Sequence, residues 1–150
     1  MPSLYTEIEI DAPKLQVWRI LFQKDRWKYW NTFLYDCDCD RPFTQGQETI
    51  LSLRRVSGEE PIEFQPIVTL VQPDGCLQWV STIPGFRNEH VFELQDIGRN
   101  RTQYIHQERF SGALSKMFLP FIRRDEQQGI QRMAWELKHY AERSSQHFRD

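Results

Sequence analysis

Two segments, Asn88-Glu-His-Val-Phe-Glu-Leu-Gln-Asp-Ile97 and Thr102-Gln-Tyr-Ile-His-Gln-Glu-Arg-Phe110, decide the fold. His90, Phe92 and Leu94 occupy every second position of the first segment, and Tyr104, His106, Glu108 and Phe110 do so in the second. In each set large apolar side chains recur, which is typical of the buried face of a half-buried β-strand. Gly98-Arg99-Asn100 lies between the two segments and carries turn-forming residues. The two segments are therefore expected to pair as antiparallel strands.

Similar alternating segments precede this pair, and turn signals such as Gln45-Gly46 and Asp74-Gly75 separate them. Pro66 interrupts one of these segments, which indicates an edge strand or a bulge, because proline has no N–H to donate to a sheet. Two short helices are expected over residues 13–22 and 26–30, the first with Asp11 as its N-cap. The expected strands cover residues 3–11, 32–40, 48–56, 62–71, 76–83, 88–97 and 102–110.

After Gly112 the apolar period changes to 3.6, which predicts a long C-terminal helix. Pro120 lies in its early part and is expected either to kink the helix or to precede its start. Strands followed by a segregated helix favour an α+β fold, with a curved antiparallel sheet of about seven strands covered by the helix. No linker or repeat divides residues 1–150, so we expect a single domain.

Composition excludes several classes of function. The chain has 150 residues, with 19 Lys plus Arg against 21 Asp plus Glu, so it carries no excess of basic residues for nucleic acid. No segment is apolar enough for a membrane span, and no signal-peptide pattern opens the chain. Three cysteines are too few for a disulfide framework, so we expect a reduced, cytoplasmic protein. Aromatic residues make up 13% of the chain and are expected to pack a core or line a pocket.

Several motifs, in order along the chain, resemble the SRPBCC superfamily of START-like and birch-pollen-allergen-like proteins, and its polyketide cyclase/dehydrase-like branch in particular. The resemblance rests on Ile10-Asp-Ala-Pro13 before Val17-Trp18, on Trp27-Lys-Tyr-Trp-Asn-Thr-Phe33, on His90-Val-Phe-Glu-Leu94, on His106-Gln-Glu-Arg-Phe-Ser-Gly112, and on Leu137-Lys138. It implies the helix-grip fold, in which a curved sheet wraps around a long C-terminal helix. Because this superfamily includes lipid binders, cyclases and chaperone activators, the fold alone does not specify the function.

The last strand pair contains the candidate polar site. His90 and Phe92 share a face of the first strand, and the apolar neighbours on that face indicate that it points inward. Glu108 is expected to pair either with His90 across the strands or with His106 along its own strand, because a buried polar group needs a partner. Two roles are open for these buried polar side chains. They either orient a ligand in an apolar pocket or form an internal hydrogen-bond network that only stabilises the fold. The inward residues of the second strand are Tyr104, His106, Glu108 and Phe110.

Further aromatic side chains are expected around the space between sheet and helix. Asp125 and Gly129 interrupt the apolar stripe of the helix, which fits either a ligand space or a local contact with a loop. Cys37 and Cys39 are interpreted as inward-facing strand residues, since zinc sites usually use a C-x₂₋₄-C spacing. No metal or cofactor is expected. The further candidate ligand-binding residues are Phe64, Trp79, Phe121, Asp125 and Trp135.

The sequence thus supports three hypotheses. The first is a module that binds a small hydrophobic molecule, such as a lipid, polyketide, isoprenoid or aromatic compound, between sheet and helix. The second is a cyclase- or dehydratase-type enzyme in which His106 or Glu108 acts on a carbonyl substrate. The third is a protein-interaction domain resembling chaperone activators, with the cavity filled by core side chains.

Overall fold

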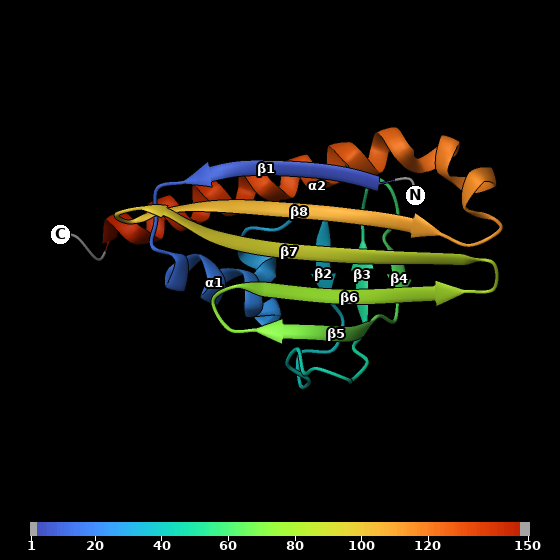
Figure 1. Ribbon diagram of the computed structural model, residues 1–150, viewed down its shortest axis with the longest axis horizontal. Helices are drawn as coiled ribbons and strands as arrows, with labels where there is room; N and C mark the ends of the chain where they lie inside the picture. Colours follow the sequence, from blue (N-terminus) through green and yellow to red (C-terminus); the bar gives the residue numbers. More distant parts are fainter. Residues whose placement is uncertain (1–2, 148–150) are drawn as a thin grey trace.

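The computed structural model describes residues 3–147, with side chains described as far as residue 144. Five strands form one antiparallel sheet in the order β1-β8-β7-β6-β5 (Figure 1). Turn residues at Asp74, Gly85 and Asn100, all with positive φ, connect its hairpins as expected. The strands are β5 (Ile67–Gln72), β6 (Cys76–Ile83), β7 (Phe86–Gly98), β8 (Arg101–Ser111) and β1 (Ser3–Ile10).

A smaller sheet of three short strands, in the order β2-β3-β4, lies behind the large one in Figure 1. The expected strand over residues 62–71 is divided at Pro66 between the two sheets, so the described residues form eight strands instead of about seven. The Pro66 carbonyl accepts a hydrogen bond from the Thr49 amide at 3.1 Å, while its ring nitrogen has no proton to donate. These strands are β2 (Leu34–Asp36), β3 (Leu51–Leu53) and β4 (Ile62–Phe64).

A long C-terminal helix, α2 (Ser115–His147), runs along the large sheet and contacts β1 and β8 (Figure 1). It is continuous through Pro120, so of the two alternatives for this proline, a helix start after it is wrong. Two shorter helical segments follow β1, namely α1 (Lys14–Phe22) and the 3-10 helix η1 (Lys24–Tyr29). Pro13, not Asp11, occupies the N-cap of α1 and makes no side-chain cap. The α+β architecture expected from the sequence is confirmed.

The buried side of α2 follows the 3.6-residue period closely. This side of the helix faces β1 and β8 of the sheet, α1 and the loop that contains Phe33, and one acidic residue, Glu126, is as buried as its apolar residues. Burying such side chains removes apolar surface from water, at about 1.5–3 kcal/mol for each large aliphatic group. The buried apolar residues of α2 are Leu119, Ile130, Met133, Ala134, Leu137 and Ala141.

The expected orientation of Cys37 and Cys39 is wrong, because both side chains are exposed. β2 ends at Asp36, whose carboxylate accepts a hydrogen bond from the buried Lys24 ammonium at 2.7 Å. A buried lysine requires a partner. This ion pair therefore holds Asp36 toward the interior, and the cysteines beyond the strand face solvent.

Gly129 interrupts the stripe of α2 because it makes a close contact with a loop and not because a ligand space opens there. A Cβ at this position would lie 2.5 Å from Cε1 of Phe33, which is fully buried. Phe33 is held from the other side as well, since its amide donates to Oδ1 of Asn31 at 3.0 Å. The missing side chain thus lets the Phe33 ring seat directly on the helix.

Gly129→Ala is expected to lower the free energy of unfolding by about 1–2 kcal/mol, because overpacking against Phe33 outweighs the gain of about 1 kcal/mol in helix propensity. Urea unfolding measures this change. In a Phe33→Leu background the same substitution should be neutral or stabilising, since the ring that causes the clash is absent. Equal destabilisation in both backgrounds would contradict the close contact as the cause.

Candidate functional site

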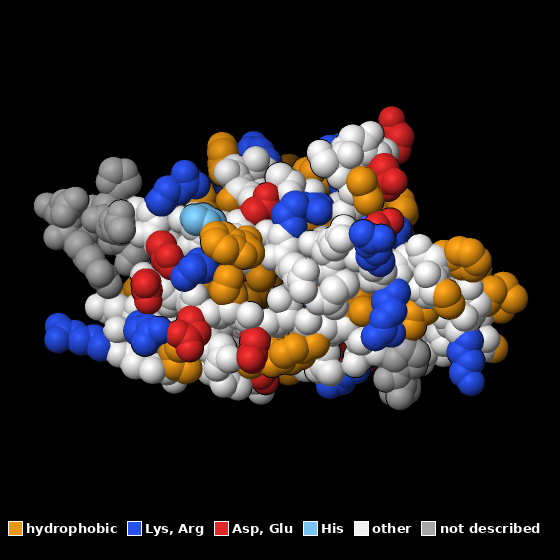
Figure 2. Space-filling model, turned by 90° about the horizontal axis from the view of Figure 1, so that it is seen from above, with side chains coloured by type: hydrophobic (Ala, Val, Ile, Leu, Met, Phe, Trp, Pro, Cys, Tyr) orange, Lys and Arg blue, Asp and Glu red, His pale blue; other side chains and the backbone are white. Residues whose placement is uncertain are grey.

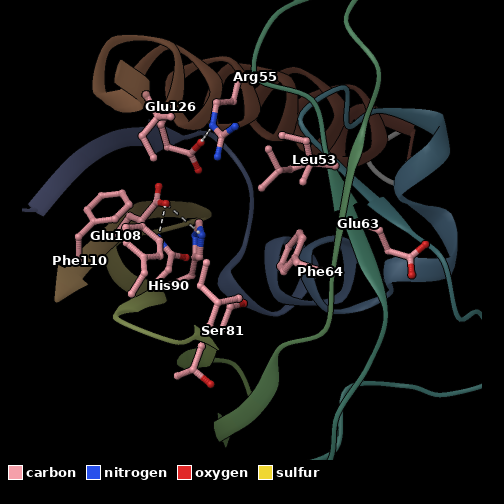
Figure 3. Close-up of a pocket in the computed structure, with 15 residues that line it drawn as sticks. Leu53, Arg55, Glu63, Phe64, Ser81, His90, Glu108, Phe110 and Glu126 are labelled. Atoms are coloured by element: carbon pink, nitrogen blue, oxygen red, sulfur yellow. Dashed lines mark hydrogen bonds and ion pairs between the residues drawn. The ribbon is translucent and has the colours of Figure 1, made fainter. Parts of the chain in front are cut away.

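A pocket of about 230 Å³ lies between the start of α2, the end of the large sheet and the small sheet (Figure 3). The half-exposed side chains of Ile62 and Ile83 stand at its mouth. Most of its wall area is apolar, and its buried polar side chains, His90, Glu108 and Glu126, lie together at its inner end, whereas Glu63 and Thr82 are exposed. The lining residues are Leu53, Arg55, Ile62, Glu63, Phe64, Ser81, Thr82, Ile83, Phe86, Asn88, His90, Glu108, Phe110, Ile122 and Glu126.

The register of β7 and β8 assembles the polar end of the pocket. His90 is the direct cross-strand partner of Glu108, and Asn88 is the partner of Phe110. Nε2 of His90 lies 3.4 Å from Oε1 of Glu108, and Nδ2 of Asn88 donates to the same oxygen at 2.7 Å. Of the two pairings left open by the sequence, His90 with Glu108 is the one that forms.

A second imidazole lies behind the first. Nδ1 of His90 is 2.9 Å from Nε2 of His106, so one of these nitrogens donates to the other. His106 also stacks on Phe92 with ring centroids 4.1 Å apart. Its Nδ1 has no hydrogen-bond partner, and neither has Oε2 of Glu108, although both atoms are buried. The result is a buried chain of polar groups from His106 through His90 to Glu108.

Glu126 and Arg55 complete this end of the pocket, and neither was predicted from the sequence. Glu126 projects from α2 toward Glu108 and pairs with the Arg55 guanidinium (Figure 3). Nη2 and Nη1 of Arg132, also on α2, donate to the Arg54 and Arg55 carbonyls at 2.7 and 3.1 Å, which holds this segment against the helix. Glu126 could have been noticed in the sequence, because it lies four residues from both Ile122 and Ile130 on the apolar side of the helix.

Burial dominates the protonation of these groups. It lowers the pKa of His90 to about 3, with a smaller contribution from the positive charge of Arg55. Burial and the neighbouring His90 hold the pKa of His106 well below its usual value of 6.5. The pKa of Glu108 is raised well above 4.5 by burial and by the negative charge of Glu126. At neutral pH both imidazoles are therefore uncharged.

The structure brings together some of the predicted site residues and separates others. Phe64, His90, Glu108 and Phe110 line the pocket. Four more are fully buried in the core beside it without lining it, and His106 reaches the pocket only through His90. These core residues are Trp79, Phe92, Tyr104 and His106.

The expected position of Phe121 and Trp135 between helix and sheet is wrong, since their side chains are 82% and 55% exposed. Each residue on a helix is turned by about 100° from the one before. Trp135 directly follows the buried Ala134 and is thereby rotated away from the sheet, where it stacks on His139. Asp125 is half-buried and lies outside the pocket.

Large exposed apolar side chains occur instead at one end of the molecule. Figure 2 shows apolar side chains at the end of the molecule where Figure 1 places the β6–β7 turn and the start of α2. Ile83, Met117, Phe118 and Phe121 are the large exposed apolar residues of these segments. Among the described helices, none is long and apolar enough to cross a membrane.

The pKa shifts predict opposite pH dependences for two variants between pH 4.5 and 6.5. In this range the unfolded chain binds protons at His90 and His106 that the folded protein does not bind, so these groups make stability rise with pH. Glu108 keeps its proton only in the folded protein, so it makes stability fall with pH. Each group contributes at most about 1.4 kcal/mol per pH unit.

Glu108→Gln should therefore steepen the rise of unfolding free energy with pH, whereas His90→Gln/His106→Gln should flatten or reverse it. Urea unfolding at several pH values measures both slopes. Gln95→Glu on the exposed face of β7 serves as a surface control. Slopes in both variants that equal the wild-type slope would show that these groups titrate normally.

No protein-family model and no curated protein matches this sequence, but many solved structures share its fold. A START superfamily protein from Mycobacterium smegmatis has a TM-score of 0.69 at 15% identity, covering 94% of this chain and 97% of that chain. Norcoclaurine synthase from Thalictrum flavum has a TM-score of 0.66 at 15% identity, covering 93% and 85%.

The di-domain ARO/CYC protein BexL from the BE-7585A biosynthetic pathway has a TM-score of 0.70 at 13% identity. The match covers 93% of this chain and 46% of that chain, so this chain spans about half of BexL. Identities this low relate the proteins by fold and leave their activities separate. The chain thus shares the fold of these solved structures, which is the helix-grip fold expected from the sequence.

Proposed function

We propose that the pocket binds a small, largely apolar molecule that carries one polar group. The observation that carries this proposal is the contrast between the mainly apolar wall of the pocket and the polar groups at its inner end, the buried Glu108 and His90 and the half-buried Asn88. Ligand pockets commonly combine an apolar lining with a few convergent polar groups that orient the ligand. Here the hydroxyl or carbonyl of a ligand would reach Glu108 while its apolar body contacts Phe64 and Phe110.

The size of the pocket limits the ligand. Its volume of about 230 Å³ is less than the range of about 300–1,000 Å³ that is usual for small-molecule sites. It therefore suits a compact molecule, such as one with one or two rings or a short isoprenoid, or one end of a longer molecule that extends past Ile62 and Ile83. The solved structures with this fold include an ARO/CYC protein and norcoclaurine synthase, which supports a small-molecule site.

A second candidate function is catalysis by the same polar groups, and the protonation of Glu108 favours it. A buried carboxyl group with a raised pKa is able to donate a proton to a carbonyl oxygen, and His90 lies next to it. His106 makes no contact with the pocket, so in such an enzyme it would be a positioning residue for His90. Glu108 and His90 would then act on the substrate.

Native mass spectrometry of the purified protein is expected to detect a co-purifying apolar molecule, which solvent extraction then identifies. Ser81→Trp should weaken its binding roughly tenfold or more, because a large side chain at this lining position occupies the pocket. Gln95→Trp, which places the same side chain on the exposed face of β7, is the matched control. Unchanged binding by a folded Ser81→Trp variant would contradict this pocket as the site.

A turnover assay on the identified molecule separates binding from catalysis. If Glu108 is a general acid, Glu108→Gln should lower the rate by about 100-fold or more while the dissociation constant changes little, since the amide keeps the shape but cannot transfer the proton. Mass spectrometry of the bound and released molecule measures both quantities. An unchanged rate would remove Glu108 from the mechanism, and the absence of any conversion by wild type would leave binding as the function.

A further inference from the structure

Three buried side chains at the inner end of the pocket offer metal ligands to one point. They are His90 on β7, Glu108 on β8 and Glu126 on α2, and each is about 1% exposed. One ligand atom from each lies within 4.8 Å of the others. The cluster is built from three separate elements and is not a row of acidic residues on a solvated face.

The hydrogen bonds at this point are incomplete unless Glu108 and Glu126 share a proton. Oε2 of Glu108 is buried and has no partner, although its other oxygen is bonded to Asn88. Leaving such an atom unpaired is unfavourable, and more so if the group is charged. Two carboxylates also face each other here with only one guanidinium, that of Arg55, to balance them. The cluster therefore needs one more positive group, either a proton or a cation.

The geometry points to a site for one divalent first-row transition metal, such as zinc, held by Nε2 of His90 and by carboxylate oxygens of Glu108 and Glu126, with a fourth position open to the pocket. Imidazole and carboxylate together are common ligands of zinc and iron. Three protein ligands with one open position is the arrangement of metal sites that bind a further molecule.

The separation of the first two ligands fits tetrahedral coordination. Nε2 of His90 and Oε1 of Glu108 are 3.4 Å apart. Two ligands at about 2.0–2.1 Å from a metal, at a tetrahedral angle, lie about 3.3–3.4 Å apart. The Glu126 carboxylate comes from the opposite side, and a rotation of its long side chain would bring its free oxygen closer to the other two ligands.

Each of the three ligands is also held by a second residue, as the ligands of metal sites generally are. His106 faces Nδ1 of His90 at 2.9 Å, and in the tautomer in which His90 donates this hydrogen bond its Nε2 is free to bind a metal. Nδ2 of Asn88 orients Glu108 at 2.7 Å, and Arg55 orients Glu126. Burial keeps the pKa of His90 low, so the imidazole is in the neutral form that binds metals.

Arg55 sets a condition on this site, because its positive charge repels a cation. Both carboxylates must therefore be ionised when the metal is bound, and Glu108 must release its proton. Metal binding is thus expected to release a proton and to strengthen as the pH rises. The cysteines do not contribute, since Cys37 and Cys39 are exposed outside the pocket. The site also does not depend on whether the pocket holds an apolar ligand.

The test is titration of the chelator-treated, dialysed protein with zinc chloride by isothermal calorimetry. Wild type should bind one zinc ion per chain, and binding should raise the unfolding temperature, because only the folded protein has the assembled site. Cobalt(II) chloride should produce the visible absorption bands of a tetrahedral ion. No saturable binding near one equivalent by wild type would overturn the proposal and leave a shared proton as the balancing charge.

Variants locate the ion. Glu108→Gln and His90→Gln should each weaken binding at least tenfold, and Asn88→Ala, which leaves all three ligands in place, should weaken it about 10–100-fold. Asn88→Ala keeps the test valid if a ligand variant fails to fold. Two controls, His139→Gln on the outer face of α2 and Cys37→Ser/Cys39→Ser, should bind as wild type does. Loss of binding in either control, or unchanged binding in a folded Glu108→Gln variant, would overturn the proposal.

Discussion

The register between β7 and β8 is the constraint on which the rest of the molecule depends. It places His90 opposite Glu108 and Phe92 opposite His106, with all four side chains on the buried face of the sheet. A shift of one residue in either strand would turn its whole buried set to the other face. The turn at residues 98–101, where the register shifts after Asp96 and Asn100 has positive φ, therefore also determines where the polar groups enter the core.

Burying these polar groups is unfavourable unless they are paired, and the pairing here is incomplete. Asn88 donates to one oxygen of Glu108, and Nε2 of His90 lies 3.4 Å from the same oxygen, while the second oxygen of Glu108 and Nδ1 of His106 have no recorded partner. A core made only for stability would be expected to use apolar residues at these positions, since those can be as stable or more so. The unpaired atoms next to a pocket are therefore better explained by a ligand, a substrate proton or an ion that completes the set.

The two-residue periodicity of the sequence predicted which side chains of a strand face inward, because this depends only on their spacing within the strand. Two-residue alternation placed His90, His106, Glu108 and Phe110 on the inward face, and all four are buried. It did not predict that Arg55 and Glu126 meet, because 71 residues separate them and no local pattern records such a contact. Phe121 is exposed although aromatic residues are usually buried, because its angle around α2 turns it away from the sheet. The inward orientation predicted for the cysteines after β2 was also wrong. This strand has only three residues, and its orientation depends on the Lys24–Asp36 ion pair.

The division of one expected strand at Pro66 has a mechanical consequence. β4 pairs only with β3 and β5 pairs with β6, so within the described residues no ladder of backbone hydrogen bonds joins β4 to β6. Ile62 on β4 and Ile83 at the end of β6 nevertheless both line the pocket. On the other side of Pro66 the backbone is tied to the chain before β3, because the Gly46 amide donates to the Val68 carbonyl at 2.7 Å and Glu48 forms a bridge with Ile67. Strand pairing therefore secures the β5 side of Pro66, whereas no strand pairing closes the pocket between β4 and β6.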